Sequence, residues 1–181
     1  MNPISFISWL LPTGGLIILI LLILLLLSYA VATRSSAVQK MIKPVQIFIA
    51  QYKIEILFFF SFTSLLGSLF YSEILNLVPC ALCWYGRICM YPIAIITGTA
   101  LLTQRKDITI FTYPFILGGI ALSSYHIGLQ QGWIPAFLCS AESGVACSTP
   151  PFIMYGFITI PSMAVIVYIT MLVTALHTRK S

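Results

Sequence analysis

The stretch LIILILLILLLL, at residues 16–27, decides the class of this protein. It belongs to an apolar run over residues 10–32. About 20 residues of α-helix cross the hydrocarbon core of a bilayer, so this run is long enough to span a membrane. Four further apolar runs follow, at about residues 54–71, 84–102, 108–129 and 152–176. The sequence therefore predicts an all-α integral membrane protein with five spanning helices.

The composition supports the same class. Of the 181 residues, 60% are hydrophobic and only 7% are charged, whereas about 25% of the residues in a soluble domain are charged. So few charged residues cannot cover a soluble domain of this size. The net charge is +5, but the basic residues form short clusters between the apolar runs. Because they do not share one soluble face, we expect no nucleic-acid partner.

The basic clusters predict the orientation in the membrane, because lysine and arginine flank spanning helices on the cytoplasmic side. With five crossings, all basic residues except Arg87 fall on one side, together with the C-terminus: Arg34, Lys40, Lys43, Lys53, Arg105, Lys106, Arg179 and Lys180. The N-terminus and the loops at about residues 72–83 and 130–151 then lie outside. Residues 30–32, Ala-Val-Ala, resemble a signal-peptide cleavage site. We nevertheless expect a retained helix, because no basic residue precedes the apolar run and the run is too long.

The motif PCALCWYGR, at residues 79–87, gives the strongest chemical signal. Cys80 and Cys83 have the CxxC spacing, which can close a disulfide or bind a soft metal. The motif lies where an outer loop enters the third predicted helix, and a helix N-terminus favours a thiolate at Cys83. Arg87 follows on the same helical face. Its guanidinium could stabilise that thiolate or an anionic reduced cofactor, or it could simply extend to lipid headgroups.

Cys139 and Cys147 form a second pair, in the loop between the fourth and fifth runs. A disulfide between them would be either a structural staple or a redox-active bond, and a second dithiol on the same side favours exchange between the pairs. His126 is expected at a depth similar to that of Arg87, where it could hydrogen-bond an oxygen atom or transfer a proton. It could equally be an ordinary interface residue. The fifth cysteine, Cys89, is predicted to be a packing residue within the third span.

Together these motifs resemble the disulfide-bond-formation protein B (DsbB) family, and the short second loop resembles its BdbC-like branch. The resemblance covers about residues 54–177. It rests on Cys80-x-x-Cys83-x-x-x-Arg87, Tyr125-His126-x-x-Leu129-Gln130, the pair Cys139 and Cys147, and GFITIP at residues 156–161.

This resemblance implies a four-helix transmembrane bundle at residues 54–177, with one extra N-terminal transmembrane helix at residues 1–33. A basic cytoplasmic linker at residues 34–53 would join them, and residues 178–181 would form a cytoplasmic tail. Family members are quinone-dependent oxidases of the bacterial plasma (inner) membrane. They reoxidise a DsbA-like, thioredoxin-fold dithiol oxidase outside the cytoplasm and pass the electrons to ubiquinone or menaquinone. The implied activity is a protein-disulfide oxidoreductase (thiol:quinone) that sustains disulfide formation in exported proteins.

The same resemblance implies four catalytic cysteines: Cys80, Cys83, Cys139 and Cys147. Cys139 would form the mixed disulfide with the partner, and Cys147 would exchange with Cys80. Cys83 would be the thiolate nearest the quinone. The residues implied in quinone binding are Arg87 and His126.

The sequence departs from the family pattern at two places. The acidic residue that precedes the arginine in the family is Gly86 here, so any role of that acid is absent. Only seven residues separate Cys139 from Cys147, which leaves the route of exchange between the two pairs open.

Three alternatives use the same residues differently. A vitamin K epoxide reductase-like quinone/disulfide oxidoreductase also combines a helix bundle with two cysteine pairs, but its loop pair precedes the CxxC motif, unlike the order here. A non-enzymatic membrane protein could bind a soft metal through the cysteines. A structural membrane subunit could carry two inert disulfides.

Overall fold

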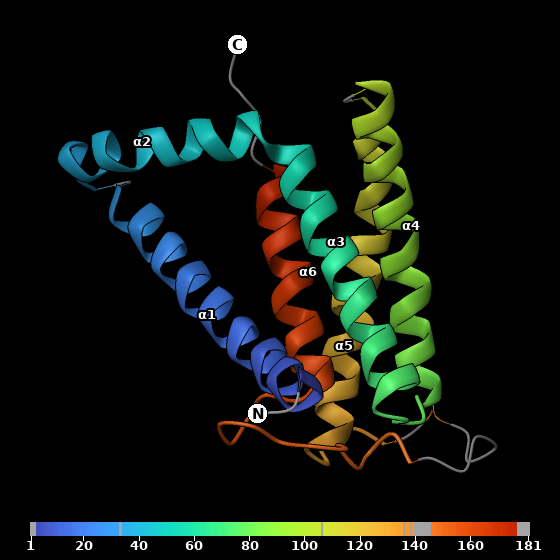
Figure 1. Ribbon diagram of the computed structural model, residues 1–181. Coiled ribbons are helices and arrows are strands. Elements are labelled where there is room, and N and C mark those ends of the chain that lie inside the picture. Colours follow the sequence, from blue (N-terminus) through green and yellow to red (C-terminus); the bar gives the residue numbers. More distant parts are fainter. Residues whose placement is uncertain are drawn as a thin grey trace.

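The computed structural model describes residues 3–32, 34–105, 107–135, 137, 139 and 146–176. Its secondary structure is helical, with one isolated β-bridge between Met154 and Ile158. The last four helices form an antiparallel bundle, and two further helices precede it (Figure 1). The helices are α1 (Pro3–Ala32), α2 (Ser36–Gln51), α3 (Lys53–Leu69), α4 (Ala81–Thr103), α5 (Tyr113–Gln130) and α6 (Ile160–Leu176).

The lengths and compositions of these helices are those of membrane spans. A π-helical turn (Phe70–Ile74) extends α3 and a 3-10 helix (Asp107–Thr112) precedes α5, so that α1, α3, α4 and α5 each belong to an apolar helical stretch of 22 to 29 residues. Helix α6 is a predominantly apolar helix of 17 residues, which is at the short end of the range of about 17–25 residues for a spanning helix. The predicted all-α, multi-pass membrane architecture is therefore confirmed.

The start of the fifth span was predicted wrongly. Helix α6 begins at Ile160, whereas the apolar run begins at residue 152. Tyr155 and Gly156 have φ angles of 52° and 79°, which is left-handed backbone that cannot continue an α-helix. Pro161 lies in the first turn of α6, where its missing N–H leaves no helical hydrogen bond unmade. Hydropathy alone could not show this turn, because its residues are as apolar as those of the helix.

The core of the bundle lies between α3, α4, α5 and α6. Tyr168 of α6 packs directly on Gly119 of α5, where any Cβ would overlap the tyrosine ring. The Tyr168 hydroxyl donates a hydrogen bond of 3.0 Å to the carbonyl oxygen of Gly86 in α4. One buried side chain thus connects three helices. The buried residues of this core are Leu57, Met90, Ile93, Ile116, Tyr168, Met171 and Ala175.

The segment expected to be a basic linker, residues 34–53, folds largely as helix α2. This helix crosses one end of the bundle and connects α1 to α3 (Figure 1). It combines Lys40 and Lys43 with exposed apolar side chains at Met41, Val45 and Phe48, which is typical of a helix at a membrane surface. The predicted tail at residues 178–181 lies outside the described residues.

The two ends of the bundle differ in chemistry. The connection between α3 and α4 and the segment before α6 lie at one end, and both contain cysteines (Figure 1). Helix α2 and the connection between α4 and α5 lie at the other end. Of the predicted basic residues, Arg34, Lys40, Lys43 and Lys53 lie in α2 or next to its ends, and Arg105 lies in the connection between α4 and α5. Lys106, Arg179 and Lys180 lie outside the described residues. The cysteine pairs and the described basic clusters therefore occupy opposite ends.

Candidate functional site

Cys80 and Cys83 lie at the start of α4. Cys80 occupies the N-cap position with extended backbone (φ −72°, ψ 170°), and its carbonyl oxygen accepts the N–H of Trp84 at 3.2 Å. Cys83 lies in the first helical turn, as predicted. The two sulfur atoms are 3.2 Å apart, both as free thiols. The helix start therefore holds the dithiol at a distance from which a disulfide can close with little movement.

The second pair, Cys139 and Cys147, is joined by a disulfide with a Cα–Cα distance of 6.3 Å. The structure describes both cysteines but not residues 140–145 between them. Cys147 is buried and belongs to one apolar cluster with Cys80, and Cys83 and Cys139 pack against that cluster. The fold thus brings together two pairs that are more than fifty residues apart in the sequence.

His126 of α5 lies between the two pairs. Its Nε2 atom is 3.1 Å from the carbonyl oxygen of Cys147 and 3.9 Å from the sulfur of Cys80. Because a carbonyl oxygen only accepts, the first contact requires a proton on Nε2. His126 is buried and is placed to hold the Cys147 backbone against the dithiol.

The surroundings of Cys80 favour its thiolate. Cys80 precedes the membrane-spanning part of α4, and its pKa is lowered, chiefly by the hydrogen bond with the Cys83 thiol and further by His126. Burial opposes this shift because it disfavours the charged form. A thiol with a lowered pKa leaves faster in disulfide exchange, so this arrangement favours the release of Cys80 as a thiolate.

Arg87 lies one helical turn after Cys83 and is buried, with 8% of its surface exposed. Its Nε atom donates to the Ser68 hydroxyl at 2.8 Å, and one Nη atom donates to the Ser68 carbonyl at 3.0 Å. The guanidinium carbon lies 5.0 Å from the centre of the Trp84 ring. Within the described ranges the one ion pair joins Arg105 and Asp107, so no described carboxylate neutralises Arg87. Its positive charge is available to a ligand.

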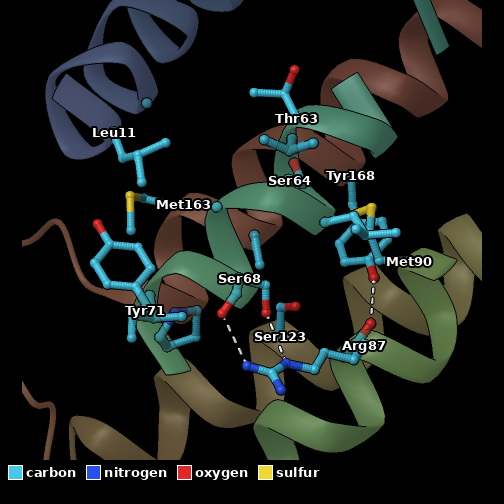
Figure 2. Close-up of a pocket in the computed structure, with 18 of the residues that line it drawn as sticks. Leu11, Thr63, Ser64, Ser68, Tyr71, Arg87, Met90, Ser123, Met163 and Tyr168 are labelled. Carbon is cyan, nitrogen blue, oxygen red and sulfur yellow. Dashed lines mark hydrogen bonds between the residues drawn. The ribbon is translucent and has the colours of Figure 1, made fainter. Parts of the chain in front are cut away.

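A cavity of about 360 Å³ lies among the helices beside this arginine (Figure 2). Cys83, Arg87 and His126 all line it. A smaller cavity of about 100 Å³ adjoins the cysteine pairs and is lined by these same three residues together with Cys80 and Cys147. The two cysteines of the CxxC motif therefore differ in position. Cys80 lines only the smaller cavity, beside the disulfide loop, whereas Cys83 lines both cavities.

Tyr71 is a site residue that the sequence did not reveal. It lies in the π-helical turn after α3 and lines both cavities. Its hydroxyl is buried and has no hydrogen-bond partner among the described residues. A buried, unpaired hydroxyl is unfavourable unless something else satisfies it. The sequence gave no signal, because a tyrosine at the end of an apolar run is ordinary.

Gly86, where the family has an acidic residue, also lines the larger cavity. A Cβ at this position would meet nothing within 4 Å. The absence of a side chain at position 86 therefore leaves open space in the wall of the cavity.

Cys80, Cys83 and His126 place one potential ligand atom each within 4.8 Å of one another. Two sulfurs and one imidazole nitrogen suit a soft or borderline ion such as Zn²⁺ or Cu⁺. Cys139 and Cys147 are joined to each other, so four free thiols do not converge. A metal could therefore be bound by Cys80, Cys83 and His126, but not by all four thiols as the sequence had suggested.

Fold and site together define a multi-pass membrane protein in which a dithiol and a disulfide lie against each other beside a ligand-sized cavity. The sequence model of the disulfide bond formation protein DsbB family matches residues 52–178, and the chain belongs to this family.

Named relatives agree with this assignment. The chain is 42% identical over 116 residues to a probable disulfide formation protein of Oceanobacillus iheyensis, which covers 62% of this chain and 79% of the relative. It is 34% identical over 126 residues to a probable disulfide formation protein C 2 of Bacillus cereus, covering 69% and 89% respectively. It is 38% identical over 112 residues to the disulfide bond formation protein C of Bacillus subtilis, covering 61% and 80%. No solved structure matches the chain significantly.

The chain is therefore a membrane protein-disulfide oxidoreductase of the branch that contains the disulfide formation proteins C, as the sequence motifs indicated. The matched region begins at residue 52, so that α1 and α2 lie outside it.

Proposed function

We propose that this protein is a quinone-dependent thiol oxidase. It reoxidises a DsbA-like, thioredoxin-fold dithiol oxidase outside the cytoplasm and so sustains disulfide formation in exported proteins. The observation that carries this proposal is the position of the CxxC motif. Cys80 packs in one cluster with Cys147, whereas Cys83 lines the larger cavity with Arg87.

The relay consists of thiol–disulfide exchanges. A thiolate of the reduced partner attacks Cys139, and Cys147 leaves as a thiolate; the partner's second thiolate then displaces Cys139 and the partner leaves oxidised. The Cys147 thiolate attacks the Cys80–Cys83 disulfide at Cys80, and Cys83 leaves as a thiolate. Attack of Cys139 on Cys147 then releases Cys80 and restores the loop disulfide. Two electrons have passed from the partner to the CxxC motif.

Exposure supports this order of attack. Cys147 is only 3% exposed, whereas Cys139 is partly exposed. A folded partner can therefore reach Cys139 more easily than Cys147. His126 serves the second exchange as a positioning residue, since it holds the Cys147 carbonyl and lies beside the Cys80 sulfur.

The residues of the larger cavity fit a quinone. Arg87 and Tyr71 would hold its ring, because the guanidinium and the otherwise unpaired hydroxyl both donate hydrogen bonds and a quinone oxygen accepts them. When bound, a ubiquinone or menaquinone supplies the two-electron oxidation that returns Cys80 and Cys83 to the disulfide. The protein's own part is to exclude water, to hold the ring and to present Cys83 to it.

The proposed orientation places both cysteine pairs outside the cytoplasm and the C-terminus inside. It is supported by the basic residues of α2 and of the connection between α4 and α5, which lie at the bundle end opposite the cysteines. Lysine and arginine favour the cytoplasmic side, and structural and catalytic disulfides persist on the oxidising side.

The proposal is tested by turnover of the full chain in lipid nanodiscs, with a reduced DsbA-like partner and with ubiquinone and menaquinone in parallel. We expect the partner to be oxidised catalytically, and we expect Cys80→Ser and Cys83→Ser each to abolish turnover. Cys89→Ser is the matched control, because Cys89 lies on the same helix but lines neither cavity. Full quinone reductase activity in both Cys80→Ser and Cys83→Ser would contradict the mechanism.

A second candidate function is the storage or sensing of a soft metal, which Cys80, Cys83 and His126 could bind. Metal analysis of the purified protein separates the two. A stoichiometric metal in protein that does not turn over would favour the metal function, whereas metal-free protein with full activity would favour the oxidase.

A further inference from the structure

Helix α1 lies outside the region that matches the family, yet it forms one wall of the larger cavity. All five α1 residues that line the cavity are apolar: Leu10, Leu11, Gly14, Gly15 and Ile18. A helix added to the family bundle thus contributes to the same space as Cys83, Arg87 and Tyr71.

The first half of α1 is fixed against the bundle by specific contacts. Pro12 is fully buried. A Cβ at Gly15 would meet the Met163 side chain of α6 at 3.3 Å, so the two helices approach closely there. The Thr13 hydroxyl lies 3.0 Å from the Tyr155 hydroxyl in the segment before α6. These contacts hold α1 at the end of the bundle that carries the cysteines.

The side chains that α1 presents to the cavity are all apolar, whereas α3 and α4 contribute the polar side chains of Ser68 and Arg87. Figure 2 shows Arg87 and Ser68 joined by hydrogen bonds on one side, with Leu11 and Met163 on the opposite side. Since α1 presents only hydrocarbon to the cavity, it cannot bind the oxygen atoms of a quinone ring. It can bind the hydrocarbon chain that a membrane quinone carries.

We infer that the first half of α1 binds the isoprenoid tail of the quinone, a role that rests on the proposed function. Leu10, Leu11 and Ile18 contact the tail, and Gly14 leaves room for it. The space beside Gly14 is open, since a Cβ there would meet nothing within 4 Å although the residue lines the cavity. The extra helix therefore sets the affinity for tailed quinones, while the bundle binds the ring.

Gly14→Leu tests this role, because it fills the open space and also raises helix propensity at that position. The matched control is Leu21→Phe, which adds bulk to an exposed position of the same helix outside the cavity. Binding is measured as quenching of Trp84 fluorescence in full-length protein carrying Trp9→Phe and Trp133→Phe. The two probes are a ubiquinone with a short isoprenoid tail and the same ring without a tail.

We expect Gly14→Leu to weaken binding of the tailed quinone about tenfold or more, since burial of about two methylene groups corresponds to a tenfold change in Kd. Its Kd for the tailless ring should stay at the wild-type value, which also shows that the variant is folded. Leu21→Phe should bind both probes like wild type.

The outcomes separate this inference from the proposed function. If wild type binds both probes and Gly14→Leu binds both equally well, or loses both equally, α1 does not bind the tail and the inference is overturned while quinone binding stands. If wild type binds neither probe, the quinone-dependent function itself is overturned.

Discussion

Cys80 and Cys83 belong to one motif but have different neighbours. Cys80 caps α4 and packs in one cluster with Cys147. Cys83, one helical turn further on, lines the larger cavity with Arg87. A disulfide that closes between them would therefore connect the loop pair to the cavity. At the residue scale, the two roles proposed for the motif follow from its position at a helix start.

The lowered pKa of Cys80 predicts an unusual pH profile for its alkylation. An ordinary thiol has a pKa of about 8.5 and loses reactivity about tenfold per pH unit below it, because only the thiolate reacts. Since the pKa of Cys80 is lowered by Cys83 and His126, its thiolate persists as the pH falls. Site-resolved mass spectrometry of the reduced protein should show a Cys80 rate that changes little between about pH 8 and pH 6.

Cys83→Ala provides the control for that profile. It removes the hydrogen bond that contributes most to the shift, so the Cys80 pKa should rise and the rate should fall with decreasing pH. If Cys80 of the wild-type protein titrates like an ordinary thiol, Cys83 and His126 do not lower its pKa and the prediction is wrong.

Tyr71→Phe removes only the hydroxyl that has no described partner. We expect the KM for quinone to rise about fivefold, because a hydrogen bond contributes about 1 kcal/mol. Without quinone, the variant should be at least as stable as wild type, since a buried unpaired hydroxyl is destabilising. Tyr85→Phe, at an exposed position that lines neither cavity, should change neither quantity. An unchanged KM in Tyr71→Phe would remove Tyr71 from the ring site.

At the scale of the elements, α5 and α6 are held together by the fit of Tyr168 on Gly119. Gly119→Ala should lower stability by about 1–3 kcal/mol, because the added methyl group overlaps a ring that is itself fully buried. Gly118→Ala is the neighbouring control, where the new Cβ would lie 3.6 Å from the Cys89 sulfur, an ordinary contact. Thermal unfolding in detergent compares the two variants. Equal unfolding temperatures for Gly119→Ala and Gly118→Ala would contradict this prediction, because they would show that Tyr168 moves to accommodate the added methyl group.

The spans could be predicted because hydropathy depends only on composition along the chain. Helices α1, α3, α4 and α5 therefore appear where the apolar runs predict them. The turn at Tyr155 and Gly156 could not be predicted, since it depends on backbone conformation within an apolar stretch. Helix α2 was expected as a basic linker, because its two lysines and Pro44 obscure a helical pattern.

The candidate site was predictable to a similar degree. The motif spacing indicated Cys80, Cys83 and Arg87, and the position of His126 at the outer end of an apolar run indicated a depth similar to that of Arg87. The contact of His126 with Cys147, however, depends on how α5 packs against the loop. Ser68 and Tyr71 reach the cavity from α3 and its π-helical turn, and no local pattern marks such residues.

At the scale of the whole molecule, the pairs lie at one end of the bundle and the cavity extends from them among the membrane-spanning helices. In the proposed function, a soluble partner approaches the loop pair from water, and a quinone enters the cavity from the lipid. The bundle would then bring two reactants from different phases to one CxxC motif. Helix α1, which precedes the matched region, contributes one wall of this cavity.

The measurement that tests the central claim most directly is the stoichiometry of coupling. Reduced partner is mixed with the full chain and quinone in nanodiscs, and the quinol formed is compared with the partner disulfide formed. Because both conversions involve two electrons, we predict one quinol for each partner disulfide and no quinol without the partner. Partner oxidation without quinol, or quinol without partner oxidation, would contradict the relay.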